Sequence, residues 1–285
     1  MQIGVIGLGL IGGSIGMELN AQIATKVYGW DLAEAHRNMA LELEIIEEIR
    51  TEEDMLKNCD LIILAIPVHL IEMKLPLLLD KITEDQFIID VGSTKKNICA
   101  AVKDHAKRSQ YVAAHPLAGT EFSGPTAAHR GLFANKKNII CDKVFSKEEF
   151  VTKTIAIFKS IGMQSIFLDS GEHDKHLAYV SHLSHISSFM LGHTVLDLEK
   201  DEKQIFNLAS TGFASTVRLA KSSPTTWNPI FSGNKEYVLE ALESYIKHLD
   251  NFANKLRTDD SDGTFALMQK ANEIKSVLDG ITTNK

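Results

Sequence analysis

Residues 7–12, Gly7-Leu8-Gly9-Leu10-Ile11-Gly12, are the stretch of sequence that decides the fold. They follow Gln2–Ile6, a short apolar run typical of a strand covered on both faces. They precede Ser14–Leu19, which is expected to open a helix, and Asp31 lies about 20 residues further on, at the end of the next predicted strand. Glycine motifs arise by chance, but this order of strand, glycines, helix and acid is typical of a dinucleotide-binding βαβ unit.

The three glycines have distinct roles in such a unit. Gly7 permits the tight turn, Gly9 lets the backbone approach a pyrophosphate, and Gly12 lets the helix pack close to the strand. The N–H groups at the start of that helix then face the phosphates. We therefore predict that the whole loop contacts the cofactor; a glycine turn of purely structural purpose is the alternative.

Asp31 bears on which dinucleotide is bound. Its carboxylate would accept hydrogen bonds from the adenosine ribose hydroxyls, and it would repel a 2′-phosphate. NAD is therefore predicted as the cofactor. NADP stays open as an alternative because Arg37 is nearby, one or two helical turns further along the chain.

Strand and helix patterns alternate through the first half of the chain. The expected strands after the first are 26–30, 60–66, 87–91 and 111–114, and the expected helices between them are 34–43, 69–79 and 95–105. Alternation at this spacing predicts a mostly parallel, doubly wound sheet. We assign residues 1–168 to an N-terminal α/β domain of the Rossmann type.

The second half changes character after the apolar run 165–168. Residues 169–174 are polar and are expected to form a break, and the chain beyond them shows helical patterns without strand runs. Long apolar helices are expected at 176–198 and 237–256. We predict an all-helical C-terminal domain over residues 169–285.

Composition and charge limit the classes of partner and compartment. The formal net charge is −7, which argues against nucleic acid because phosphate binding needs a basic face. The scattered cysteines Cys59, Cys99 and Cys141 fit neither a disulfide framework nor a zinc site. The apolar N-terminus lacks a signal peptide's basic region and cleavage site, and no stretch approaches the roughly 20 apolar residues that span a bilayer. We expect a cytoplasmic protein with no membrane or nucleic-acid partner.

Ligands of open α/β sheets bind beyond the carboxyl ends of the strands. Three segments are expected there, and we predict cofactor contacts from Ala65 and Pro67 in the first of them. Ser93, in the second, is an N-cap for the following helix, a site residue, or both. His115, in the third, is either an acid–base group or a structural histidine bonded to backbone.

The helical half offers further polar candidates. His182 and His185 are three residues apart and therefore share a helix face. That spacing could hold a metal, but no third ligand follows a familiar pattern, so we predict substrate contact or helix packing and no metal. Arg218, in a small and apolar neighbourhood, is either a carboxylate clamp or an exposed charge.

Taken together, these segments resemble the prephenate dehydrogenases and their relatives, the arogenate dehydrogenases. The resemblance covers most of the chain, in the family's order. The block from His115 to Gly124 (HPLAGTEFSG) is far more specific than the glycine loop. The other matching pieces are the loop with Asp31, residues 90–95 (DVGSTK), 181–185 (SHLSH), and 216–224 (TVRLAKSSP) followed by Trp227.

This resemblance implies NAD-dependent oxidative decarboxylation of prephenate to 4-hydroxyphenylpyruvate in tyrosine biosynthesis, by a homodimer joined through the helical domain. It implies that neutral His115 accepts the proton of the substrate's 4-hydroxyl and that Ser93 orients this histidine. Arg218 would bind a substrate carboxylate. The remaining implied substrate-side residues are His182, His185, Thr120 and Glu121.

Three alternatives remain beside this reading. The substrate could be arogenate, which has an amino-acid side chain in place of the pyruvyl group. The chain could be a β-hydroxyacid dehydrogenase or imine reductase, although these rely on a lysine of the helical domain. It could also be a non-catalytic NAD sensor, which would leave Ser93, His115 and Arg218 without a role.

Overall fold

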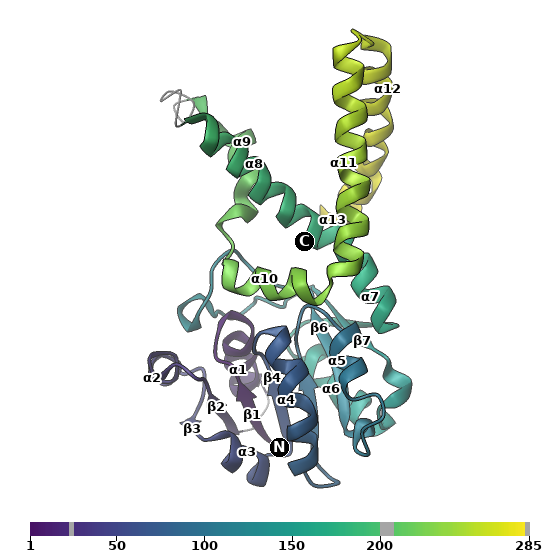
Figure 1. Cartoon of the computed structure of the whole chain (residues 1–285). Coiled ribbons are helices and arrows are strands. Elements are labelled where there is room, and N and C mark those ends of the chain that lie inside the picture. The colour runs from purple at the N-terminus through teal and green to yellow at the C-terminus, as the bar shows by residue number, and fades with distance from the viewer. Residues whose placement is uncertain (23–25, 200–207, 283–285) are drawn as a thin grey trace. The chain divides into compact units, whose positions relative to one another are not determined.

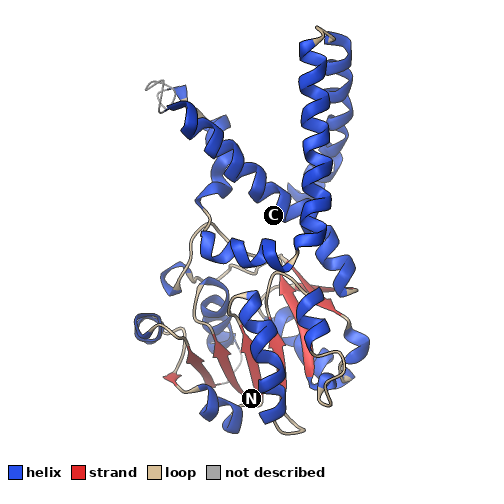
Figure 2. Ribbon diagram, viewed as in Figure 1, coloured by secondary structure: helices blue, strands red, loops and turns tan. Residues whose placement is uncertain are grey.

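The computed structural model describes residues 1–22, 26–199 and 208–282 and separates into two compact units, Met1–Asn234 and Lys235–Lys285 (Figure 1). A single sheet organises the first unit, with strand order β3-β2-β1-β4-β5-β6-β7-β8 (Figure 2, red). Its strands are β1 Gln2–Ile6, β2 Lys26–Trp30, β3 Glu48–Ile49, β4 Leu61–Leu64, β5 Phe87–Asp90, β6 Tyr111–Pro116, β7 Lys137–Cys141 and β8 Gln164–Leu168.

All neighbouring strands are parallel except β6 and β7. The expected doubly wound sheet is thereby confirmed, and the strand order reverses between β1 and β4, where such sheets bind ligands. β7 is an addition to the expected strands, and its antiparallel pairing sets Ile139 opposite His115.

Helices cover both faces of this sheet. On one face, Ile15 of α1 (Leu10–Gln22) and Phe150 of α6 (Glu148–Ser160) share a core with Val5 of β1 and Ile63 of β4. On the other, α3 (Glu52–Asn58), α4 (Val68–Lys81) and α5 (Lys96–Ala101) pack on residues such as Ile62. Adjacent Ile62 and Ile63 face opposite cores, as a strand's period of two requires. The remaining elements of this part are α2 Glu34–Glu42, η1 Arg108–Gln110, η2 Pro125–Ala127 and η3 Lys143–Phe145.

The expected break at residues 169–174 is wrong, because a helix begins there. The Asp169 side chain accepts the N–H groups of Gly171 and Glu172 and so caps α7, Ser170–Leu177. α7 continues through a π-helical turn, η4 Ala178–His182, into α8, Leu183–Glu199. The first unit ends with α9 Thr211–Val217, η6 Arg218–Lys221 and α10 Pro224–Gly233.

The second unit is a helical hairpin with a short extension. α11 (Lys235–Arg257) and α12 (Ser261–Ala271) are joined at Asp260, whose carboxylate accepts the Gly263 N–H and pairs with Lys255 at 2.8 Å. η7 Asn272–Ile274 and α13 Lys275–Thr282 follow. In neither unit does a helix of the described residues have both the length and the apolarity to cross a bilayer.

Candidate active site

The glycine loop lies between the end of β1 and the start of α1. Gly7 has φ of +97°, and a Cβ on it would lie 2.3 Å from the Ala65 carbonyl oxygen. A Cβ on Gly12 would lie 1.9 Å from the Gly7 carbonyl oxygen, so α1 packs directly on the turn. Gly9 differs, because no atom lies within 4 Å of the corresponding position. The loop thus has two glycines enforced by the protein and one that borders open space.

Asp31 ties the end of β2 to this loop. Its carboxylate accepts the N–H of Leu8 at 2.9 Å and that of Ala33 at 3.0 Å, and His36 Nδ1 lies 3.2 Å from it. Arg37 Nη1 donates to the carbonyl oxygen of Asp31 at 2.7 Å and to that of Leu32 at 3.1 Å. The guanidinium is therefore held by backbone oxygens. Leu10 and Ile11 follow at the partly buried start of α1, and Pro67, which is exposed, precedes α4.

A buried ion pair supports the turn that carries Ser93. Lys95 Nζ is hydrogen-bonded to Asp90 Oδ2 and, at 2.8 Å, to the carbonyl oxygen of Ala114. Asp90 also accepts the Gly92 N–H at 2.9 Å and the Tyr111 hydroxyl at 2.6 Å. Both charged side chains are completely buried, which is tolerable only when each polar atom is satisfied. The network ties the turn to β6 one residue before His115.

Asp174, not Ser93, caps the helix that follows this turn. Its two carboxylate oxygens accept the N–H groups of Lys95 and Lys96 at 2.8 and 2.9 Å, across 79 and 78 residues of chain. The structure places half-buried Ser93 after β5, beside the end of β6, since Asp90 pairs with Ala113. The N-cap alternative for Ser93 is therefore wrong, because the carboxylate of Asp174 accepts these N–H groups.

His115 is joined to two residues of α7. Its Nδ1 lies 2.8 Å from His173 Nε2, and His173 Nδ1 lies 2.7 Å from Asp174 Oδ1. Burial lowers the pKa of His115 well below 6.5, with positive charge at His173 and Lys95 acting in the same direction. The imidazole is thus neutral at ordinary pH. The pKa of His173 is also lowered by burial, with Asp174 opposing that shift.

His173 and Asp174 were not predicted as site residues, because residues 169–174 were expected to form a break. A local signal was present, because Asp169 and Glu172 have the spacing of a capping box at a helix start. A helix from residue 170 would have placed both polar residues on a regular element. The contact of His173 with His115 has no local signal, since it joins positions 58 residues apart.

His182 and His185 both contact Trp227 of α10. The His185 ring stacks on the indole with centroids 3.4 Å apart, and the His182 ring meets it edge-on at 6.0 Å. Burial lowers the pKa of His182 to about 4. Asn234, another residue the sequence analysis did not single out, donates to His182 Nδ1 at 3.2 Å and to the Asp174 carbonyl oxygen at 2.7 Å. His182, His185 and Trp227 thus form an uncharged aromatic cluster, and Asn234 connects it to α7.

Arg218 is paired with Glu121 across 97 residues, with Nη1 3.1 Å from Oε2. The arginine side chain is 53% exposed and the glutamate 17%. A backbone hydrogen bond and then the charge of Arg218 lower the pKa of Glu121, although partial burial opposes them. Thr120, next to it, is exposed and accepts the Phe122 N–H at 3.2 Å. The segments 115–124 and 216–224 therefore meet at the Glu121–Arg218 ion pair.

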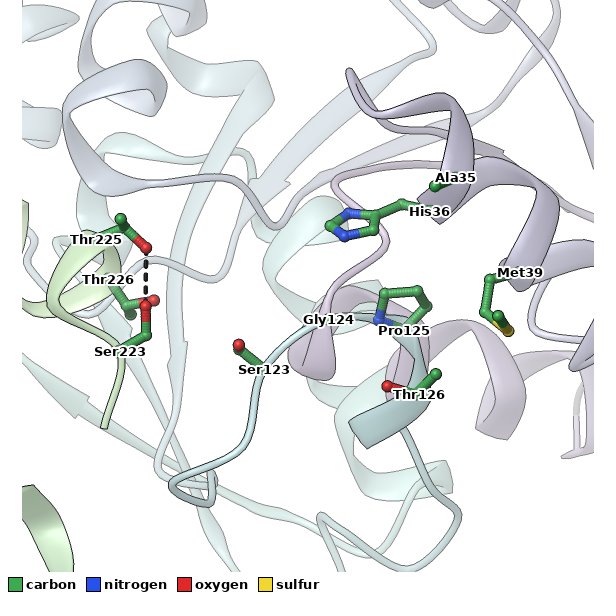
Figure 3. A pocket seen from close by; sticks show the side chains of 10 residues that line it. All are labelled: Ala35, His36, Met39, Ser123, Gly124, Pro125, Thr126, Ser223, Thr225 and Thr226. Atoms are coloured by element: carbon green, nitrogen blue, oxygen red, sulfur yellow. Dashed lines mark hydrogen bonds between the residues drawn. The ribbon is translucent and has the colours of Figure 1, made fainter. Parts of the chain in front are cut away.

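Two adjoining cavities lie beside this pair and extend toward α2. One has a volume of about 440 Å³, and Figure 3 shows His36 on one side of it, residues 123–126 below, and Ser223 with Thr225 opposite. The other, of about 600 Å³, is lined by residues 121–123 and 126–129 and by Lys221 and Ser223. They share Ser123, Thr126 and Ser223, so the cleft runs from the neighbourhood of Asp31 to that of Glu121. His115 lines neither cavity and lies deeper, 9% exposed.

Among the described residues, no three His, Cys, Asp or Glu side chains gather as metal ligands do. Cys59, Cys99 and Cys141 are buried thiols. Burial raises the pKa of Cys59 and of Cys99 to about 12, and that of Cys141 still further, so all three remain protonated.

Comparison with known proteins bears on this arrangement. Residues 15–167 match the family model for the prephenate dehydrogenase nucleotide-binding domain, and residues 169–270 match that for its dimerization domain. The chain is 29% identical to a prephenate dehydrogenase of Lactococcus lactis, over 96% of this chain and 77% of that protein.

Solved structures agree in fold over nearly the whole chain. A prephenate dehydrogenase from Aquifex aeolicus, in complex with hydroxyphenyl propionate and NAD+, has 25% identity and a TM-score of 0.89, with 98% of both chains covered. A Synechocystis arogenate dehydrogenase has 25% identity and a TM-score of 0.77, covering 98% of this chain and 100% of that one. Two family models that together match residues 15–167 and 169–270, and solved relatives of the same fold, show that this chain belongs to the prephenate dehydrogenase family.

Proposed function

We propose that this chain oxidatively decarboxylates prephenate to 4-hydroxyphenylpyruvate with NAD, with His115 as the base. The observation that carries the proposal is the neutral His115 imidazole at the end of β6, held through Nδ1 by His173. A general base must be unprotonated at working pH and fixed in direction. Both conditions are met, because burial keeps the His115 imidazole neutral and His173 holds its direction.

The glycine loop and Asp31 fit NAD. The open position beside Gly9 is where a pyrophosphate would approach the backbone, while Gly7 and Gly12 are fixed by contacts inside the protein. Asp31 is set to meet the ribose hydroxyls and disfavours a 2′-phosphate, and Arg37 is turned to backbone oxygens. When bound, NAD would supply the hydride acceptor.

The chain's own residues would then accept the substrate's hydroxyl proton and bind its carboxylates. His115 Nε2 takes the 4-hydroxyl proton as hydride leaves C4 and CO2 leaves C1, and the proton returns to the phenolate oxygen. Ser93, at the adjacent strand end, would orient the hydroxyl. Arg218 would bind one carboxylate of the prephenate dianion, with Thr120 and Glu121 at the same mouth. His182 and His185 would line the substrate ring.

We also propose that residues 1–168 bind the cofactor and that 169–285 form the substrate and homodimer domain. Large apolar side chains are exposed on α8, α11 and α12, as a dimer interface would require. They include Met190, Leu196, Leu249, Leu256 and Phe265. Light scattering of the purified chain should give twice the 31.5 kDa chain mass; a monomer at micromolar concentration would contradict this assignment.

The decisive assay is NADH formation on adding prephenate, with arogenate and NADP in parallel. The expected result is a higher kcat/KM with prephenate and NAD than with any other pairing. A higher kcat/KM with arogenate would mean that the chain catalyses the same reaction on arogenate, and the proposed substrate would be wrong. NAD binding without turnover of either substrate would refute the proposed enzyme activity.

A further inference from the structure

Three buried side chains form a line that begins at the proposed base. His115 contacts His173, and His173 contacts Asp174, over distances of 2.8 and 2.7 Å. His173 and Asp174 are completely buried in α7, so water does not compete for these hydrogen bonds. Neither belongs to the sequence segments that led to the substrate and cofactor assignments.

We propose that His173 is a positioning residue for this reaction, which fixes the tautomer of His115 and holds the proton that His115 takes from the substrate. This inference rests on the proposed function. It adds a second histidine and a carboxylate behind the base.

The tautomers follow from the hydrogen bonds. An ionised Asp174 can only accept, and its oxygens already receive the N–H groups of Lys95 and Lys96 at the start of α5. His173 must therefore donate from Nδ1, which leaves its Nε2 as an acceptor. His115 must in turn donate from Nδ1 to that nitrogen. The nitrogen of His115 that can take a proton is then Nε2.

The proton transfers balance along this line. The O–H bond of the substrate hydroxyl breaks, and its proton bonds to His115 Nε2. The Nδ1 proton of His115 then passes to His173 Nε2, so His115 is neutral again and His173 becomes an imidazolium beside Asp174. When the phenolate has formed, the reverse shift returns one proton to its oxygen, and no proton is gained or lost.

The surrounding charges favour this location for the proton. Burial lowers the pKa of both imidazoles, and Lys95 disfavours positive charge on either. His182 acts in the same direction on His115. On His173, by contrast, Asp174 and Asp90 both favour the protonated form. Of the two imidazoles, His173 is the one with a carboxylate in contact.

His173→Gln tests the relay through kinetics, because a glutamine can accept the Nδ1–H of His115 but cannot take up its proton. We expect kcat to fall by about 10-fold or more and its acid limb to move to lower pH, with KM for prephenate and Kd for NAD within about 2-fold. Ser170→Ala is the matched control, a small change on the same helix that should leave the profile as in the wild type. Unchanged kcat, or a loss equal at every pH, would overturn the relay.

Nitrogen-15 NMR of the imidazoles tests the tautomers without turnover. In the wild type we expect neutral His115 to carry its proton on Nδ1, and in His173→Phe to carry it on Nε2. A wild-type His115 protonated on Nε2 would overturn the inference even in an active enzyme. The expected tautomers in a protein that turns over neither substrate would refute the proposed function and leave the hydrogen-bond assignment intact.

Discussion

The glycine loop and the His115 site are built by different physical means. In the loop, shape is enforced by close backbone contacts: a side chain on Gly12 would meet the carbonyl oxygen of Gly7 at 1.9 Å, and one on Gly7 would meet that of Ala65 at 2.3 Å. Around His115, each constraint comes from far along the chain, from His173 and from the Lys95–Ala114 bond. The loop is therefore fixed by backbone sterics and the site by buried hydrogen bonds. Substitutions should separate the two.

The largest expected effect is on the His115 side. His115→Asn removes the base while keeping a polar side chain, so kcat should fall by about 100- to 10,000-fold. The loop is untouched, and Kd for NAD, measured by fluorescence titration, should stay near the wild-type value. Near-normal turnover in this variant would remove the role assigned to His115.

Two alanine substitutions distinguish the loop glycine that the protein constrains, Gly12, from the one that borders open space, Gly9. Gly12→Ala places a methyl group against rigid backbone and should cost about 1–3 kcal/mol of unfolding free energy, together with NAD affinity. Gly9→Ala meets no protein atom, so stability should change by less than about 1 kcal/mol while Kd for NAD rises by about 10-fold. Denaturant titration and NAD binding measure both. If Gly9→Ala binds NAD normally, the pyrophosphate is not at this loop.

Arg218 is half-exposed and should affect substrate binding more than the chemical step. Arg218→Ala should raise KM for prephenate by about 10- to 100-fold with a smaller change in kcat, since a charge-assisted hydrogen bond is worth roughly 1.5–3 kcal/mol. Lys103→Ala removes one exposed positive charge after α5 and serves as the control for net charge. Equal KM changes in the two variants would indicate a general electrostatic effect and no clamp.

The smallest expected effect concerns cofactor choice. Asp31→Asn keeps the shape of the side chain and removes the charge that repels a 2′-phosphate. The ratio of kcat/KM for NAD to that for NADP should fall by about 10-fold, by an increase for NADP. A ratio that does not change would mean that Arg37 and the cleft, and not this carboxylate, set the preference.

The same contrast explains what the sequence could predict. The glycine loop and the doubly wound sheet were predicted from local spacing. The resemblance named Arg218 and Glu121 as substrate-side residues, but their pairing was not predicted. The helix at 170–177 was missed although Asp169 and Glu172 signalled its start. The contacts of His173 and Asp174 were not accessible, because hydrogen bonds between positions 58 or more residues apart depend on packing that no local pattern specifies.

The central claim is that His115 is a base kept neutral by its buried surroundings, and the pH dependence of kcat/KM with prephenate and NAD tests it most directly. A base loses activity as pH falls through its pKa. Because the pKa of His115 lies well below 6.5, activity should stay level as the pH falls to 6.5 and decline only below that value. An acid limb at or above pH 6.5 that is absent from His115→Asn would contradict the account.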